Sequence, residues 1–358
     1  MKKYETKRYL KQKKFKNVFL SEDKNYLIEI KRNKKVPCKC FPKTIIFIIT
    51  SFILLALFFI NRMLRKYNYI NIAYSVDNIY HYIAHVSMKS IMLSQKPTTF
   101  INFYILCSNI TDEQKQVINR ISSQHKNCKI EYIDVGDQFK EFKIPKHKSV
   151  LWTTATFYRM LLPILFPKEK KMLFLDADTL IYKDLNKIYN YNITDKYYIG
   201  MLEYKIFGKY FKEKFDNFIN TGVLLCNLEE LRKGNILEKF IEFHKTHDKI
   251  DCPVNDAVNI VSHEKNGFFP PEYVVIGFCN EQDAQEYYSK ATIKINQTAV
   301  VKAFKDPYIY HMINYGKPWI VIPRKNKKKM CVDLFTRFYE MSRKTDFYYK
   351  ILKIFEIE

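Results

Sequence analysis

Residues 171–180 read KMLFLDADTL, an apolar strand that ends in two aspartates one residue apart. Successive side chains of a strand point to opposite faces, so Asp176 and Asp178 can converge on one cation only where the strand breaks into a turn. A buried strand that delivers such a pair to the carboxyl edge of a sheet favours a divalent metal that holds a phosphorylated ligand. By itself the triplet more often serves a turn or a helix cap, so its neighbours must decide.

The composition is that of a folded protein with room for one large domain or two small ones, since the 358 residues are 47% hydrophobic and 27% charged. The net charge of +23 is uneven, because residues 1–43 hold fifteen Lys or Arg against four Asp or Glu. This Lys-rich tail lacks the aromatic and glycine pattern of RNA-binding segments and runs directly into an apolar segment. We therefore expect no nucleic-acid partner, and we interpret the charge as a sign of membrane topology.

The apolar segment covers residues 44–60 and contains no charge, Pro or Gly. As a helix it would be about 26 Å long, which is sufficient for a thin bilayer. A signal peptide would not follow more than forty polar residues, and a core helix would carry a polar stripe. We expect a single-pass type II membrane anchor with residues 1–43 as a cytosolic tail and residues 61–69 as a short stem. The large domain would then lie in the Golgi or ER lumen of a eukaryote, or at the cytoplasmic face of a bacterial inner membrane.

Beyond residue 69, short apolar strands alternate with helical patterns, which predicts an α/β fold with a mostly parallel sheet covered by helices. No linker divides residues 70–320, so we treat them as one catalytic domain. Residues 321–358 form a basic, aromatic tail that lies either on a membrane surface or against the main domain. The expected strands are 69–75, 100–107, 129–135 and 221–227, and the expected helices are 79–93, 111–124, 151–165, 236–247 and 253–262.

Five more segments accompany the aspartate pair: NIAYSVDNIY (71–80), TTATFYRMLLP (153–163), NTGVLLCNL (220–228), CPVNDAVN (252–259) and HMINYGKPW (311–319). In order and spacing they resemble the family 8 glycosyltransferases, the retaining group that includes bacterial lipopolysaccharide galactosyltransferases and glycogenin. The resemblance covers about residues 70–320. It implies a GT-A-type fold, a Rossmann-like mixed sheet flanked by helices. It also implies a hexosyltransferase that moves a hexose from a UDP-sugar to a hydroxyl of a glycan, glycolipid or glycoprotein.

The resemblance assigns five residues to the donor: the four that follow here, and Lys317. Asp77 can accept the ring N–H of uridine, and the Tyr80 phenol can stack on the pyrimidine, although ordinary helix packing would also explain Tyr80. Arg159 stands on an otherwise apolar helix and must find an anion, which is either the diphosphate or a structural carboxylate. Asn220 would contact the donor sugar, although an Asn before Thr-Gly can also be a plain turn.

The metal site implied by the resemblance consists of Asp176, Asp178 and His311, which would bind Mn²⁺ or Mg²⁺. A single His near a strand end is usually structural, but here Lys-Pro-Trp follows it at the offset seen in the family. Lys317 would then meet the diphosphate as a point charge and aid departure of the nucleotide.

The chain departs from the family at residues 252–259, where relatives commonly read P-D-Q-D-x-x-N. Val254 replaces the acid that grips sugar hydroxyls, and Asn255 replaces the Gln under the anomeric carbon. Because valine cannot accept a hydrogen bond, donor recognition must be altered, with Asp251 or Asp256 as a substitute. Asn314 also stands where relatives usually carry Gly. Asn255 and Asp256, together with Lys317, remain the expected catalytic residues.

Two other functions stay open. The first is a nucleotide-sugar or glycan-binding module that has lost catalysis through Val254. The second is a haloacid-dehalogenase-type phosphatase, whose first strand also ends in D-x-D. In those enzymes one residue separates the second Asp from a Thr, whereas Thr179 follows Asp178 directly.

Overall fold

The computed structural model describes residues 43–64, 67–78, 80–145, 152–203, 218–247, 250, 252–278, 280–290, 294–313, 317, 319 and 332–354. The chain divides into two units, residues 1–60 and residues 61–358. Most of helix α2 (Lys43–Leu64) belongs to the first unit, and the rest of the basic tail lies outside the described residues. Within the described part of the chain, no helix is both long enough and apolar enough to cross a membrane. The anchor predicted over residues 44–60 is therefore not confirmed.

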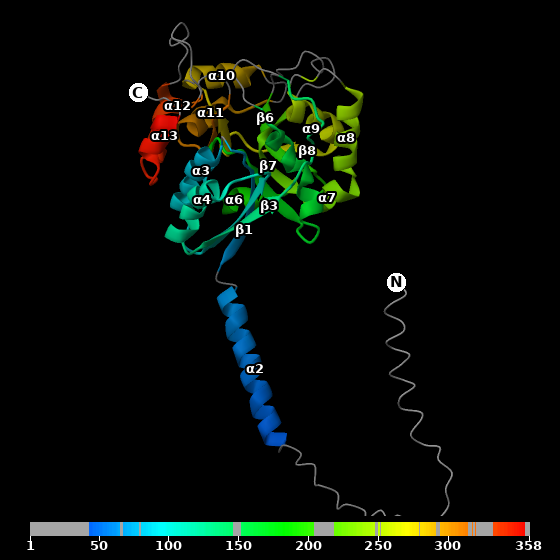
Figure 1. Ribbon diagram of the computed structural model, residues 1–358, viewed down its shortest axis with the longest axis vertical. Coiled ribbons are helices and arrows are strands. Elements are labelled where there is room, and N and C mark those ends of the chain that lie inside the picture. Colours follow the sequence, from blue (N-terminus) through cyan, green and yellow to red (C-terminus); the bar gives the residue numbers. More distant parts are fainter. Residues whose placement is uncertain are drawn as a thin grey trace, which may run out of the picture. The chain divides into compact units, whose positions relative to one another are not determined.

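The second unit is built on a seven-stranded sheet in the order β3-β2-β1-β4-β7-β6-β8 (Figure 1). The pairs β2–β3, β1–β2 and β1–β4 are parallel, whereas β7 runs antiparallel to both β4 and β6, and β8 is parallel to β6. The sheet is thus mixed, as the resemblance implies, and its parallel half comes from the regular alternation of strand and helix. The strands are β1 (Asn68–Ser75), β2 (Thr99–Cys107), β3 (Cys128–Asp134), β4 (Lys171–Leu175), β6 (Tyr198–Glu203), β7 (Phe218–Asn227) and β8 (Asn266–Phe268).

Helices bury both faces of this sheet, because neighbouring side chains of a strand enter different cores. In β4, Leu173 packs into one hydrophobic cluster and Met172 into the other. Figure 1 shows α3 and α4 on one side of the strands and α7, α8 and α9 on the other. The helices on the first side are α3 (His81–Ser94), α4 (Asp112–Gln124) and α6 (Asn186–Tyr189). Those on the second side are α7 (Leu228–Lys233), α8 (Ile236–Thr246) and α9 (Pro253–Ser262).

A second, three-stranded sheet brings a distant part of the chain to the aspartate pair. It consists of β5 (Thr179–Ile181), β10 (Ile309–His311) and β9 (Val274–Ile276), with β10 in the centre. β10 runs antiparallel to β5, and His311 pairs with Thr179. The register therefore places His311 opposite the residue that follows Asp178. The helices α10 (Glu281–Ser289) and α11 (Gln297–Lys305) lie between β9 and β10 in the chain, and the 3₁₀ turn η2 (His263–Lys265) lies between α9 and β8.

The prediction of an α-helix over residues 151–165 is wrong in the type of helix. Residues 154–161 form the 3₁₀ helix η1 (Thr154–Leu161), and only α5 (Leu162–Leu165) is α-helical. No side chain caps the start of η1, and its β-branched threonines favour α-helix poorly. The Thr156 amide donates to the Thr153 carbonyl three residues earlier at 3.0 Å, which is the bond pattern of the tighter turn.

The described part of the carboxyl-terminal tail forms α12 (Val332–Ser342) and α13 (Tyr348–Ile354). Leu334, Phe338 and Ile351 are fully buried in the same cluster as the side chains of α3. Of the two alternatives for this tail, the structure therefore shows packing against the main domain.

Candidate active site

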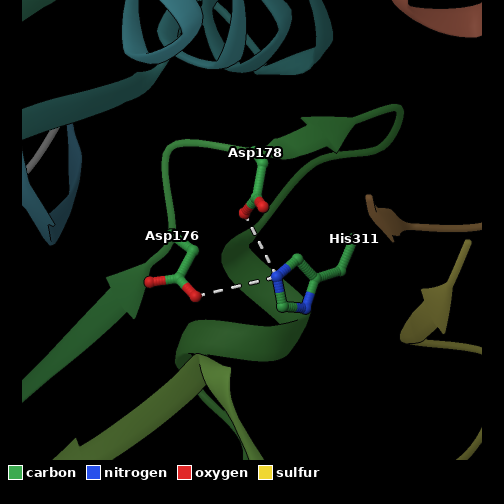
Figure 2. Close-up of side chains that lie close together, drawn as sticks. All are labelled: Asp176, Asp178 and His311. Atoms are coloured by element: carbon green, nitrogen blue, oxygen red, sulfur yellow. Dashed lines mark ion pairs between the residues drawn. The ribbon is translucent and has the colours of Figure 1, made fainter. Parts of the chain in front are cut away.

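Three potential metal ligands converge where two sheets meet (Figure 2). Asp176 follows β4, Asp178 precedes β5 and His311 ends β10. The His311 Nε2 lies 3.2 Å from Asp178 Oδ1 and 3.7 Å from Asp176 Oδ2. One ligand atom from each residue lies within 4.8 Å of the others. The residues that the sequence predicted as a metal site are thus brought together.

Backbone contacts hold this arrangement. The Asp176 amide donates to the Gly222 carbonyl at 2.7 Å, and the Met312 amide donates to the Asp178 carbonyl at 2.9 Å. Gly222 also makes room for two ligands, because a Cβ at this position would lie 2.1 Å from His311 Cε1 and 2.6 Å from Asp176 Oδ2. The glycine of NTGVLLCNL is therefore a steric requirement of the site.

The donor set fits a divalent cation. Asp178 and His311 are buried, and Asp178 Oδ1 accepts no well-aligned hydrogen bond among the described residues, although His311 Nε2 lies 3.2 Å away. A buried carboxylate oxygen of this kind is costly unless a ligand satisfies it. Two carboxylates with one imidazole suit the borderline-hard divalent ions. The site can therefore hold such an ion through Asp176, Asp178 and His311.

Lys317 lies against the same carboxylate, with its Nζ 2.5 Å from Asp178 Oδ2. Burial alone would raise the pKa of Asp178, but the Lys317 ammonium and the His311 imidazole lower it further than burial raises it, so the net pKa lies below the ordinary value. The pKa of Lys317 shifts in the opposite direction. Burial lowers this pKa, but the charges of Asp178 and Tyr80 raise it by more, so that it lies above its usual range. Both groups are thus charged at neutral pH.

A cavity of about 110 Å³ opens beside the metal site. Asp77 is fixed at its edge, since one carboxylate oxygen accepts from the Tyr80 amide at 2.8 Å and the other from the Thr153 hydroxyl at 2.7 Å. The Tyr80 ring lies edge-on to Trp319, with 6.3 Å between ring centroids. The cavity is lined by Ser75, Asp77, Tyr80, Trp152, Thr153, Ala155, Thr156, Arg159, Asp176, Ala177, Asp178 and Lys317. Six residues that the sequence assigned to donor or metal therefore share one cavity.

Arg159 pairs with a carboxylate of the chain itself. Its NH2 donates to Asp176 Oδ1 at 2.8 Å, its NH1 donates to the Thr221 carbonyl, and its guanidinium lies 4.3 Å from the centre of the Phe174 ring. Asp176 is itself a predicted metal ligand, and Arg159 also lines the cavity, so the predicted contact of Arg159 with the donor diphosphate stays a prediction. Arg159 thus orients one oxygen of Asp176 and leaves the other toward His311.

A second, narrow cavity contains the expected catalytic residues Asn255 and Asp256. Asn255 Oδ1 accepts from both the amide and the hydroxyl of Thr221. Asp256 Oδ2 accepts from the Cys252 amide at 2.9 Å, which fixes the start of α9. Both side chains are therefore fixed by hydrogen bonds within the protein. Asn255 is bound to Thr221 of β7, the strand that contains Gly222, and Asp256 is bound to the start of α9.

Glu203 lines the same narrow cavity and was missed by the sequence analysis. It is buried at the end of β6 and accepts from Asn220 Nδ2 at 3.1 Å. Burial raises the pKa of Glu203 to about 7, against the opposing effects of the Asn220 hydrogen bond and of His311. An acid directly after the apolar run YIGML carries the same signal as the aspartate pair and could have been noticed. Asn220, predicted to contact the sugar, is itself buried and bound to Glu203.

Val254 is not one of the residues that line the narrow cavity, although its neighbour Asn255 is. It is 4% exposed and packs with Ala257 and Val258 in the hydrophobic cluster that underlies α9. The substitution for the family's acid is therefore accommodated as a core residue. Asp251 and Asn314 lie outside the described residues.

Comparison with known proteins finds distant sequence relatives and similar folds. The chain is 23% identical over 282 residues to a lipopolysaccharide 1,2-glucosyltransferase of Escherichia coli, covering 72% of this chain and 82% of the relative. It is 23% identical to general stress protein A of Bacillus subtilis, covering 72% of this chain and 89% of that protein. The galactosyltransferase LgtC, solved with donor and acceptor sugar analogues, has a similar fold, with a TM-score of 0.61, 18% identity and coverage of 79% of this chain and 100% of LgtC.

A profile of the whole family provides the assignment. Residues 71–322 match Glycosyl transferase family 8, a range that includes both cavities, the metal site and Lys317. It agrees with the residues 70–320 over which the sequence resembles this family. The chain therefore belongs to glycosyltransferase family 8.

Proposed function

We propose that this chain is a metal-dependent, retaining hexosyltransferase that takes its hexose from a UDP-sugar. The observation that supports it best is the position of Asp176, Asp178 and Lys317 on the wall of the cavity that also holds Asp77 and Tyr80. A bound metal ion and a buried ammonium can bind the diphosphate of a nucleoside diphosphate. An aromatic ring and a carboxylate can bind its base. The acceptor would be a hydroxyl of a glycan, glycolipid or glycoprotein.

Charge stabilisation would drive the reaction. Asp176, Asp178 and His311 would hold Mn²⁺ or Mg²⁺, which supplies Lewis-acid stabilisation of the diphosphate. The Lys317 ammonium is buried and charged, so it can neutralise the charge that develops on the leaving group without reorganisation of water. Asn255 is a poor nucleophile and is already bound to Thr221, and Asp256 is bound to the Cys252 amide. These contacts favour a same-face reaction over a covalent intermediate.

A panel of UDP-sugars tests this proposal. The purified full-length chain is incubated with each donor and Mn²⁺, with and without chelator, and released UDP is measured. We expect metal-dependent release for at least one donor and its loss in Asp178→Asn. If the protein binds a donor but releases no UDP under any condition, the proposal that it is an enzyme is overturned, and a nucleotide-sugar-binding module is favoured. Family membership displaces the phosphatase alternative.

The location of the chain is a separate proposal. We propose a type II arrangement in which residues 1–43 are cytosolic. Its support is the basic tail together with the exposed apolar side chains of α2, among which Phe47, Phe52 and Leu54 are 73%, 69% and 66% exposed. Protease treatment of intact vesicles tests it: we expect digestion of the tail and protection of the large domain in a eukaryotic host, and the opposite pattern would overturn it.

A further inference from the structure

A row of buried hydroxyl groups leads from β1 to the turn that carries the metal ligands. The Tyr74 hydroxyl lies 2.8 Å from Ser87 Oγ, and Ser87 Oγ lies 3.0 Å from Thr179 Oγ1. Thr179 Oγ1 donates to the carbonyl of Asp176 at 2.9 Å. All three hydroxyl-bearing residues have an exposure of 0%, so bulk water cannot replace these bonds.

The final carbonyl sets the direction of this row, because a carbonyl oxygen can only accept. Thr179 uses its proton there, so Ser87 must donate to Thr179, and Tyr74 must donate to Ser87. Burial raises the pKa of Tyr74, which keeps the proton on its phenol at neutral pH. Ser87 and Thr179 each accept one bond and donate one. Hydrogen bonds aligned in this way polarise one another, so the row is stiffer than three separate contacts.

Thr179 touches all three metal ligands through different parts of the residue. Its backbone follows Asp178 directly, and its side chain binds the carbonyl of Asp176. Across the small sheet it is the register partner of His311. A shift of Thr179 would therefore move all three ligands, and the Ser87 hydroxyl anchors it to α3.

We propose that Thr179 and Ser87 are positioning residues that hold the Asp176–Asp178 turn in its cation-binding geometry. This inference rests on the proposed metal dependence. Residues that orient metal ligands typically change metal affinity about 10–100-fold when they are lost. A purely structural role would lower the stability of the fold and leave the affinity of the folded protein for metal unchanged.

The substitutions Thr179→Val and Thr179→Ser separate these two roles. Valine keeps the shape of threonine without the hydroxyl, and serine keeps the hydroxyl without the methyl group. The Mn²⁺ dissociation constant is measured by titration of the paramagnetic resonance signal of free Mn²⁺, which needs no activity, and thermal unfolding is followed alongside. We expect Thr179→Val to weaken Mn²⁺ binding about 10–100-fold and Thr179→Ser to bind nearly as the wild type does.

Ser342→Ala is the matched control. Ser342 is also fully buried, and its hydroxyl donates to the Phe338 carbonyl at 2.8 Å within α12 and not to a residue of the metal turn. It should lose stability without any change in Mn²⁺ affinity. If Thr179→Val does not fold, Ser87→Ala takes its place, with the same expected direction.

The outcomes distinguish this inference from the proposed function. Wild-type protein that does not bind Mn²⁺ would overturn the metal site and the function built on it. Wild-type protein that binds Mn²⁺, with equal affinity in Thr179→Val or its replacement, would overturn the positioning role alone. Equal weakening in Thr179→Val and Thr179→Ser would also overturn it, because the methyl group and not the hydroxyl would then matter.

Discussion

Lys317 and Asp178 form a buried ion pair at the point where a divalent cation would bind. The Lys317 Nζ lies 2.5 Å from Asp178 Oδ2, while Asp178 Oδ1 faces His311 at 3.2 Å. One carboxylate therefore faces an ammonium on one side and the potential metal site on the other. Without a cation, Lys317 is the main counter-charge of Asp178, and a cation would compete with it for the same negative charge.

The first prediction is that Lys317→Met tightens Mn²⁺ binding in the absence of nucleotide by about tenfold, which corresponds to about 1.4 kcal/mol. The reason is that the removal of the ammonium leaves Asp178 as an uncompensated buried charge, which a cation then neutralises. Turnover of the UDP-sugar should fall in the same variant, because the leaving diphosphate loses its positive partner. Mn²⁺ titration and UDP release on one preparation check both effects.

Lys183→Met is the control for this experiment. Lys183 pairs with Asp306 at the same distance, 2.5 Å, outside the candidate site. Its loss should change neither Mn²⁺ affinity nor UDP release. Weaker Mn²⁺ binding in Lys317→Met would show that the lysine supports the ligand geometry instead of competing with the cation.

The second prediction is that Gly222→Ala removes most of the metal affinity. The new methyl group would overlap the His311 ring and crowd Asp176 Oδ2, so at least one ligand must move. Gly267→Ala offers a control in β8, because its methyl group would crowd the Cδ1 end of the Ile199 side chain at 2.5 Å and reach Lys196 Cγ only at 3.8 Å, and a change of the Ile199 rotamer can relieve this contact. We expect a large loss of Mn²⁺ binding in the first variant and none in the second. Equal binding in both would show that the cation does not need His311 and Asp176 in the positions that Gly222 allows.

The metal site could be predicted from the sequence because its residues lie in continuous motifs. Asp176 and Asp178 end an apolar strand, and His311 and Lys317 belong to one nine-residue segment with a family spacing. The alternation of strands and helices likewise predicted the parallel half of the sheet. In each case the signal is local, so the chain displays it before folding.

The remaining features depend on contacts between distant segments. Ser87 and Thr179 are 92 residues apart, and their hydrogen bond exists only because α3 packs against β5. The contact of Arg159 with Asp176 could not be predicted either, because η1 and the turn after β4 meet only in the folded chain. The 3₁₀ geometry of η1 was missed because a hydrophobic pattern over so few residues does not distinguish the two helix types.

The third prediction concerns Val254, at the position where the resemblance to the family implies an acid. Val254→Asp would place a carboxylate among the apolar side chains of the cluster under α9, at a cost of several kcal/mol in stability. We therefore expect a large loss of stability in denaturant unfolding and no gain in turnover of UDP-galactose or UDP-glucose. Val258→Asp, one turn later in the same cluster, should be equally damaging. A well-folded Val254→Asp with higher turnover than wild type would contradict this account and restore the position to the donor site.

The last prediction uses the raised pKa of Glu203. Burial raises this pKa from 4.5 to about 7, so the folded chain binds the proton more tightly than the unfolded chain. Binding of this proton stabilises the folded chain by about 3 kcal/mol in total. This stabilisation is fully present below pH 4.5 and is lost as the pH rises to about 7. Glu203→Gln keeps an oxygen that accepts from Asn220 and cannot ionise. Relative to wild type, it should therefore gain about 2 to 3 kcal/mol between pH 5 and pH 8 in denaturant unfolding with chelator present. Titrating groups that do not interact with Glu203 contribute equally to both proteins, so their effects cancel in this difference. Parallel stability curves for the two proteins would show that Glu203 ionises normally in the folded chain.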